Sequence, residues 1–111
     1  MTGKPAILIF AVDDPGRVIS EVTSGIEEEG VFYEFVKPEN DAPANALAEQ
    51  GAKLSRLDVG IGIDCNGCVA LHYQKMTKPL YQLLPGSNIE DLRKLGNNAA
   101  RLVKGIPLHQ I

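Results

Sequence analysis

The sequence predicts an α/β fold with a mixed sheet flanked by helices. Over the first half of the chain, strand-like and helix-like segments alternate as β-α-β-α. A β-hairpin follows at residues 57–73, and a long amphipathic helix at residues 89–104 comes near the end. The alternating part indicates parallel strands joined by crossover helices, and the hairpin adds an antiparallel neighbour.

The first half supplies two strands and two helices. Residues 6–12 form a continuous apolar run, typical of a strand buried on both faces. Asp14 can cap the helix that follows, with Pro15 at its first position, and Gly30 ends it after about Glu29. A second strand is expected at residues 31–37 and a second helix at residues 44–55.

The hairpin is the most regular segment of the sequence. Val59, Ile61 and Ile63 alternate with small or polar residues, and a second alternating run, Val69-Ala-Leu-His-Tyr73, returns after the turn. Asn66-Gly67 between them favours a tight turn because both residues tolerate a positive φ. The face that contains Gly60 and Gly62 has almost no side-chain bulk, so we expect backbone or side chains to approach it closely.

Two further elements follow the hairpin. Residues 80–84 have the length and composition of a short fifth strand, which gives a sheet of four to five strands. Ser87 and Glu90 match a capping box, with serine as the capping residue and glutamate three positions later. The helix after this box has an apolar stripe made of Ile89, Leu92, Leu95, Ala99 and Leu102.

Size and composition are those of an ordinary globular domain. The chain has 111 residues, of which 44% are hydrophobic and 23% charged, so we expect a single domain over residues 1–111. A net charge of −3 without a Lys/Arg cluster argues against nucleic acid and against an anionic membrane surface. Without a signal peptide or an apolar run of membrane-spanning length, we expect a cytoplasmic protein with reduced cysteines.

Three consecutive acids, Glu27-Glu28-Glu29, close the first predicted helix. The helix dipole disfavours negative charge at a C-terminus by about 0.3–1 kcal/mol for each exposed residue. A solvated surface run explains the acids equally well. The functional interpretation is that a cation, either a metal ion or a partner's Lys/Arg, meets them in a complex. Adjacent glutamates diverge on a helix, so this chain would supply about one ligand to a Mg²⁺ or Ca²⁺ ion.

The other candidate sites are weaker. Cys65 and Cys68 have CxxC spacing, but a structural zinc site needs four ligands, and a thioredoxin-type pair sits at the start of a helix, whereas this pair flanks a turn. Asp13 and Asp14 follow the first strand, where α/β sheets bind ligands, yet the helix cap accounts for Asp14. His72 is predicted on the second hairpin strand, either on the glycine face or as a satisfied surface histidine. No nucleophile–base spacing and no phosphate loop indicates an enzyme.

Several segments together resemble a known family. They are Leu57-Asp-Val-Gly-Ile-Gly-Ile-Asp64, Gly67-x-Val69-Ala-Leu-His72 and Leu95-Gly-Asn-Asn-Ala-Ala-Arg-Leu-Val-Lys-Gly-Ile-Pro-Leu108, with Ile26-Glu-Glu-Glu-Gly-Val31 in the N-terminal half. The chain resembles the small (β) subunit of the diol/glycerol dehydratase reactivating factor over nearly its whole length. The resemblance implies a three-layer α/β/α fold, similar to the anticodon-binding domain and to the dehydratase medium subunit.

The resemblance also implies a function without an active site in this chain. Reactivases of this family are α2β2 complexes that release damaged cobalamin from coenzyme B12-dependent diol and glycerol dehydratases. Their large subunit has an Hsp70-like ATPase domain. Their small subunit and the dehydratase medium subunit can exchange places on it, which opens the dehydratase and frees the dead cofactor.

The family implies a role for one of the three glutamates. A glutamate near the end of the first helix helps to bind a divalent metal at the junction with the large subunit, and alignment on Glu-x-Gly-Val places it at Glu28, with Glu27 and Glu29 as fallbacks. Mg²⁺ or Ca²⁺ would be shared with the large subunit and not bound by this chain alone. The family gives no role to Cys65 and Cys68.

Two alternative functions stay open at this point. One is a medium-subunit-like component of a cobalamin-dependent dehydratase, and the other is a thiol oxidoreductase that uses Cys65 and Cys68. The sequence does not decide between diol and glycerol dehydratase as the partner, nor whether the protein resides in a bacterial microcompartment. It also leaves open whether the isolated chain forms a homo-oligomer.

Overall fold

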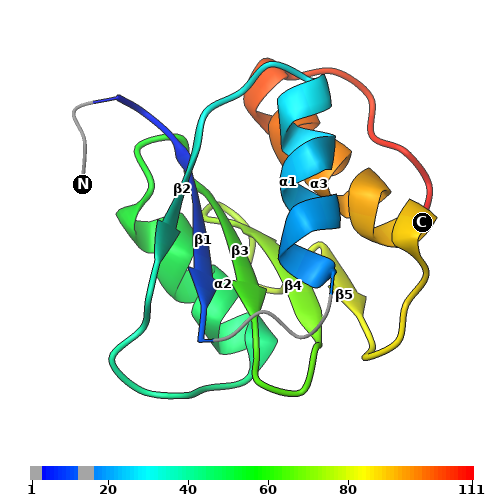
Figure 1. Ribbon diagram of the computed structural model, residues 1–111. Helices are drawn as coiled ribbons and strands as arrows, with labels where there is room; N and C mark the ends of the chain where they lie inside the picture. The colour runs from blue at the N-terminus through cyan, green and yellow to red at the C-terminus, as the bar shows by residue number, and fades with distance from the viewer. Residues whose placement is uncertain (1–3, 13–16) are drawn as a thin grey trace.

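Five strands and three helices make up the part of the chain that the computed structural model describes, residues 4–12 and 17–111 (Figure 1). In the sheet the strands lie in the order β2-β1-β3-β4-β5. β1 pairs in parallel with both β2 and β3, whereas β3, β4 and β5 are successively antiparallel. The α/β class and the mixed sheet are therefore confirmed. The elements are β1 (Ile7–Ala11), α1 (Val18–Glu28), β2 (Tyr33–Val36), α2 (Ala44–Leu54), β3 (Val59–Ile63), β4 (Val69–Tyr73), β5 (Tyr81–Leu83) and α3 (Ile89–Lys104).

Helices cover both faces of the sheet. α1 and α3 lie side by side on one face, and α2 lies on the other (Figure 1). Successive residues of β1 point to opposite faces, so Ile7 and Ile9 join the core under α1 and α3 while Leu8 and Phe10 pack with Leu47 of α2. This explains why the first strand is apolar at consecutive positions, as predicted.

The hairpin is confirmed with the predicted strands. Its turn is fixed by the Asp64 carboxylate, whose Oδ1 accepts hydrogen bonds from the backbone N–H groups of Asn66 (2.9 Å) and Cys68 (3.0 Å). Gly67 has a φ of 93°, a value that favours glycine. The positive φ expected of the turn is therefore found at Gly67 but not at Asn66, and the hydrogen bonds to Asp64 hold the turn in addition.

The glycine face of β3 is closely approached, as the sequence predicted, and the approaching element is α2. A Cβ atom built on Gly60 would lie 2.2 Å from the backbone N of Ala52, and one built on Gly62 would lie 2.1 Å from the backbone O of Ala44. The α2 backbone thus rests on the sheet where side chains are missing. Small residues on the helix side of this contact (Ala44, Ala48 and Ala52) are buried as well.

The cap of α3 differs from the prediction, and the predicted cap of α1 lies outside the described residues. Asn88, not Ser87, caps α3: its side chain accepts a hydrogen bond from the backbone N–H of Asp91 at 2.8 Å. The Ser87 hydroxyl donates instead to the backbone O of Leu84. Serine and asparagine are both good capping residues, so the sequence alone could not choose between neighbours. The predicted Asp14 cap and Pro15 lie outside the described residues, as does Asp13.

Candidate functional site at the end of helix α1

Two of the three glutamates at the end of α1, Glu28 and Glu29, contact α3 because the two helices approach each other very closely. Their backbones meet at two glycines: a Cβ atom on Gly96 would lie 2.0 Å from the backbone O of Val22, and one on Gly25 would lie 2.2 Å from the backbone O of Arg93. α3 therefore presents its polar side chains directly to the end of α1. Glu28 and Glu29 meet residues about 70 positions further along the chain.

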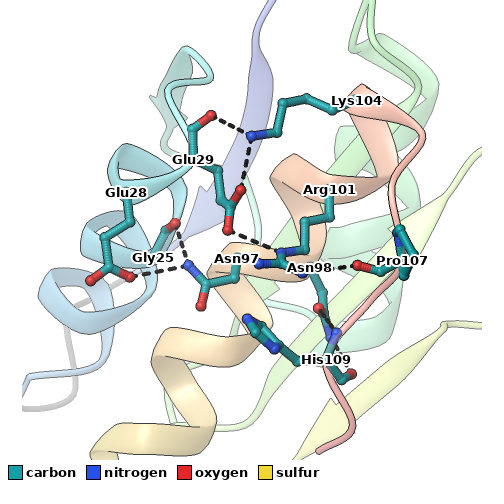
Figure 2. A network of polar contacts seen from close by, with 9 residues as sticks. All are labelled: Gly25, Glu28, Glu29, Asn97, Asn98, Arg101, Lys104, Pro107 and His109. Atoms are coloured by element: carbon teal, nitrogen blue, oxygen red, sulfur yellow. Dashed lines mark hydrogen bonds and ion pairs between the residues drawn. The ribbon is translucent and has the colours of Figure 1, made fainter.

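Glu29 is held by two cations of α3. Its Oε2 lies 3.0 Å from Arg101 Nε, and its Oε1 lies 2.8 Å from Lys104 Nζ, which also donates to the backbone O of Glu29 (Figure 2). Its side chain is only 13% exposed. The hydrogen bond from Lys104, followed by the one from Arg101, lowers the pKa of the Glu29 carboxyl.

Glu28 has a looser environment. Its Oε1 accepts a hydrogen bond of 3.1 Å from Asn97 Nδ2, which also donates to the backbone O of Gly25 at 2.7 Å (Figure 2). Its Oε2 lies 3.9 Å from Nη1 of Arg93, which binds mainly the buried Glu21 at 2.7 Å. Half of the Glu28 side chain, 52%, stays exposed. Of the acids in the run, Glu28 combines a fixed position with room for a further ligand.

Glu27 contacts the neighbouring strand β2. Its Oε1 accepts a hydrogen bond of 2.6 Å from the hydroxyl of Tyr33 in β2. This bond raises the pKa of the Tyr33 phenol, since the carboxylate holds the proton in place.

The acidic run does not need a cation from outside the chain, contrary to our interpretation of the sequence. Arg101 and Lys104 neutralise Glu29 within the chain, and Arg93 lies near Glu28. The misplaced charges at the helix end are thus compensated by α3, which the sequence pattern of α1 alone could not reveal. A metal role for Glu28 stays a prediction that rests on the family and on the exposure of its carboxylate.

The Glu29 cluster predicts a pH-dependent contribution to stability. A lowered pKa in the folded state stabilises the fold above the unfolded-state pKa, about 4.5, and this contribution disappears as the pH falls through the lower folded-state value. We expect Glu29→Gln to cost about 1 kcal/mol at pH 7 and low salt. Urea unfolding of both proteins at several pH values should show the difference shrinking below pH 4.5. A difference that grows as the pH falls would contradict the assignment.

This chain alone offers no complete metal site in its described part. No group of three or more His, Cys, Asp or Glu side chains among residues 4–12 and 17–111 could hold a metal ion. A single exposed carboxylate fits an ion whose other ligands come from a second subunit, since Mg²⁺ and Ca²⁺ both take oxygen ligands from several sources. A shared ion at Glu28 therefore stays a prediction that rests on the family.

The two cysteines have properties opposite to those of a reactive pair. Both are free thiols at the hairpin turn. Cys65 Sγ donates a hydrogen bond to Asp41 Oδ2 at 3.2 Å, and this bond raises the pKa of its thiol. Burial, together with the charge of Asp64, raises the pKa of Cys68. Because the thiolate is the nucleophile, this setting disfavours thiol–disulfide chemistry.

His72 lies on the glycine face, the first of the two placements that the sequence left open, and is not a surface histidine. It is 3% exposed and lies opposite Gly60 in the β3–β4 ladder, on the face covered by α2. Its Nδ1 is buried and has no hydrogen-bond partner among the described residues. The alternation of β4 gave its face correctly, but it did not show that α2 extends over that position.

Sequence reasoning missed the α3 residues of the site. Arg93, Asn97 and Arg101 are spaced four apart, and so they line one side of the helix beside the apolar stripe. That spacing is visible in the sequence, but it says nothing about which helix the row would meet. The structure shows that the row meets α1.

Comparison with known proteins agrees with the fold. Residues 4–109 match the model of the family described as "Dehydratase medium subunit". The chain belongs to this family. The propanediol dehydratase-reactivating factor small subunit of Salmonella typhimurium is 40% identical over 110 residues, which cover 96% of this chain and 92% of the relative. The diol dehydratase-reactivating factor small subunit of Klebsiella michiganensis is 38% identical and is covered to 86%.

Solved structures of dehydratase reactivases are also similar to this chain. A chain of a glycerol dehydratase reactivase superposes with a TM-score of 0.89 at 33% identity, covering 96% of this chain and 98% of that chain. A chain of a diol dehydratase-reactivating factor complexed with ADP and Mg²⁺ gives 0.87 at 36% identity, covering 97% and 100%. Within the family, this chain groups with the small subunits of dehydratase-reactivating factors. The description of the relatives as small subunits implies a larger partner subunit. The description as part of a reactivating factor is consistent with a non-catalytic role.

No helix in the described part of the chain is long and apolar enough to cross a membrane.

Proposed function

We propose that this chain is the non-catalytic small subunit of a reactivase that releases damaged cobalamin from a coenzyme B12-dependent diol or glycerol dehydratase. The chain would bind to a large ATPase subunit in an α2β2 complex. ATP-dependent exchange with the dehydratase medium subunit would then open the dehydratase. The observation that supports this best is the 40% identity, over 96% of the chain, to a propanediol dehydratase-reactivating factor small subunit.

Glu28 is our candidate ligand for a divalent cation at the junction with the large subunit. Its carboxylate is held at one oxygen by Asn97 and is 52% exposed, so it can accept a further ligand without breaking its contact. Glu29 is less suitable, because Arg101 and Lys104 already occupy both of its oxygens. Carboxylates of the large subunit would complete the coordination of Mg²⁺ or Ca²⁺. The ion would attract Glu28 and the carboxylates of the large subunit at once.

A binding measurement tests this assignment. We expect Glu28→Gln to weaken the complex with a reactivase large subunit by about tenfold in Mg²⁺. The amide keeps the shape and can still accept from Asn97, but it lacks the charge that holds the ion. Calorimetric titration in Mg²⁺ and in EDTA should show that the wild-type chain responds to the metal and that the variant does not.

Glu27→Gln is the matched control, because it removes the same charge one residue away while its amide oxygen can still accept from Tyr33. We expect its affinity to stay within about twofold of the wild type. Equal weakening by both changes would indicate general electrostatics and contradict a specific ligand role for Glu28. A wild-type affinity that EDTA leaves unchanged would remove the metal from the proposal.

The release activity needs its own test. Dehydratase inactivated with cyanocobalamin should lose the bound corrin when the large subunit, this chain, ATP and Mg²⁺ are all present. Omission of this chain should leave the corrin bound. Release that is equally fast without this chain would contradict the proposed role.

A second candidate follows from the description of the family itself. Its model is that of the dehydratase medium subunit, so the chain could instead form part of a cobalamin-dependent dehydratase. Reconstitution with the other dehydratase subunits and adenosylcobalamin distinguishes the two. Diol or glycerol dehydration would favour the second candidate, and assembly with the ATPase subunit would favour the first.

A further inference from the structure

The outer edge of the sheet at β2 presents apolar side chains to solvent. β2 lies at one end of the strand order and has β1 as its neighbour in the described sheet (Figure 1). Phe35 is 50% exposed, and Phe32, directly before the strand, is 59% exposed with Lys4 Nζ 4.7 Å from its ring centroid. Phe35 packs edge-to-face on Tyr33, with ring centroids 5.7 Å apart. An apolar edge strand of this kind is a template for pairing with another strand.

The backbone N–H and C=O groups of successive β2 residues point alternately toward β1 and away from it. The backbone O of Phe32 accepts a hydrogen bond from Ile7 N at 3.0 Å, and Tyr33 is the register partner of Ile7. In a parallel ladder, Phe32, Glu34 and Val36 therefore turn their N–H and C=O groups toward β1. Tyr33 and Phe35, and Lys37 directly after the strand, turn theirs outward.

We propose that a second copy of this chain pairs with this edge, β2 against β2 in antiparallel orientation, about a two-fold axis that passes between the two Phe35 residues. This inference goes beyond the proposed function and does not depend on it. Each copy offers the same edge, as an isologous contact requires. Phe35 then faces Phe35 of the second copy, and Tyr33 faces Lys37 of the second copy. The outward N–H and C=O groups of all three residues pair across the junction.

Charge complementarity favours this register. Lys37 is exposed, and no ion pair of its side chain is found in the described part of the chain. In the dimer, Lys37 of the second copy lies on the same face as Tyr33, whose hydroxyl donates to Glu27. The ammonium group thus meets an aromatic ring and a carboxylate, and symmetry repeats the contact.

The neighbouring registers are poorer. A shift that moves the axis to Glu34 places two like charges directly opposite each other, which destabilises a strand pair. A shift to Val36 loses both the facing phenylalanines and the Tyr33–Lys37 contact. The sequence of β2 therefore selects the axis at Phe35.

Analytical ultracentrifugation of the isolated chain tests the dimer. The junction is small, so we expect a dissociation constant in the micromolar range, visible between about 10 µM and about 1 mM. Phe35→Lys places two ammonium groups at the axis and should weaken the dimer at least about tenfold. Leu84→Lys is the matched control, because Leu84 is 75% exposed and directly follows β5, the strand at the opposite edge of the sheet. A chain that stays monomeric at 1 mM, or equal effects of both changes, would overturn the proposal.

Cross-linking tests the register and does not depend on how Phe35→Lys folds. In a chain with Cys65 and Cys68 changed to serine, Phe35→Cys should form a disulfide-linked dimer with oxidised glutathione. Directly paired Cα atoms in such a ladder lie about 5.5 Å apart, within disulfide reach. Glu34→Cys, one position away, should cross-link at least about tenfold more slowly, because it faces Val36 of the second copy. Preferential cross-linking of Glu34→Cys, or of neither variant, would refute the pairing.

Discussion

Replacing Gly60 with alanine should lower the free energy of unfolding by about 3 kcal/mol, because the added methyl group has no space between β3 and α2. Its position would be 2.2 Å from the backbone N of Ala52 and 2.3 Å from the backbone O of Ala48. Both obstacles are backbone atoms of a helix, so no side-chain rotation can relieve the clash. α2 must move away from the sheet, and its contacts on both sides of Gly60 loosen together.

Urea unfolding followed by circular dichroism measures this loss. Gly30→Ala is the matched control, since it makes the same chemical change at a glycine with nothing within 4 Å of the added atom. Gly30 has a φ of 74°, so alanine there should cost about 1 kcal/mol from backbone strain alone. Similar losses for both variants would show that the close helix–sheet contact does not govern the effect.

The sequence predicted the elements of this fold because local patterns specify them. The alternation of Val59, Ile61 and Ile63 and the Asn66-Gly67 turn gave the hairpin with its observed bounds. The bare face of Gly60 and Gly62 also predicted the close approach of another element. That α2 is the approaching element follows from the crossover between β2 and β3, which local patterns do not fix.

The helix-end site shows where sequence reasoning stops. The run of three glutamates was a real anomaly for α1, and the physical argument against it was correct for an isolated helix. The compensating residues Arg101 and Lys104 lie more than 70 positions away on α3. Which helix faces meet depends on the glycines that let α1 and α3 touch. A sequence shows such glycines but not their partners.

The family signature in α3 acquires a structural meaning from the same contacts. Gly96 allows the close crossing with α1, and Asn97 holds the backbone O of Gly25 and the carboxylate of Glu28. Asn98, the next residue, points to the other side and holds the C-terminal segment (Figure 2). Consecutive residues of one short motif thus connect α3 to two different parts of the chain.

Asn98→Asp should be the most destabilising single-atom exchange in α3. We expect it to lower the free energy of unfolding by about 3 kcal/mol at pH 7. Asn98 is fully buried; its Nδ2 donates to the backbone O of His109 at 3.0 Å, and its Oδ1 accepts from the backbone N of His109 at 2.7 Å. An aspartate keeps the acceptor but replaces the donor with a charged oxygen that faces the carbonyl of His109. Burial and this repulsion both favour the protonated form, which can donate again.

The pH dependence separates this explanation from a simple packing defect. The carboxyl of the variant should have a raised pKa in the folded state. The variant's loss of unfolding free energy should therefore develop as the pH rises above the unfolded-state pKa of about 4, and be smaller below it. Hydrogen exchange at the His109 amide should accelerate by about 100-fold at pH 7, because the segment after Gly105 loses its anchor. Asn45→Asp, the same exchange at an exposed position in the first turn of α2, should be neutral or slightly stabilising, since the helix dipole favours negative charge there. A deficit of Asn98→Asp that is equal at pH 4 and pH 7 would show that the lost donor is not its cause.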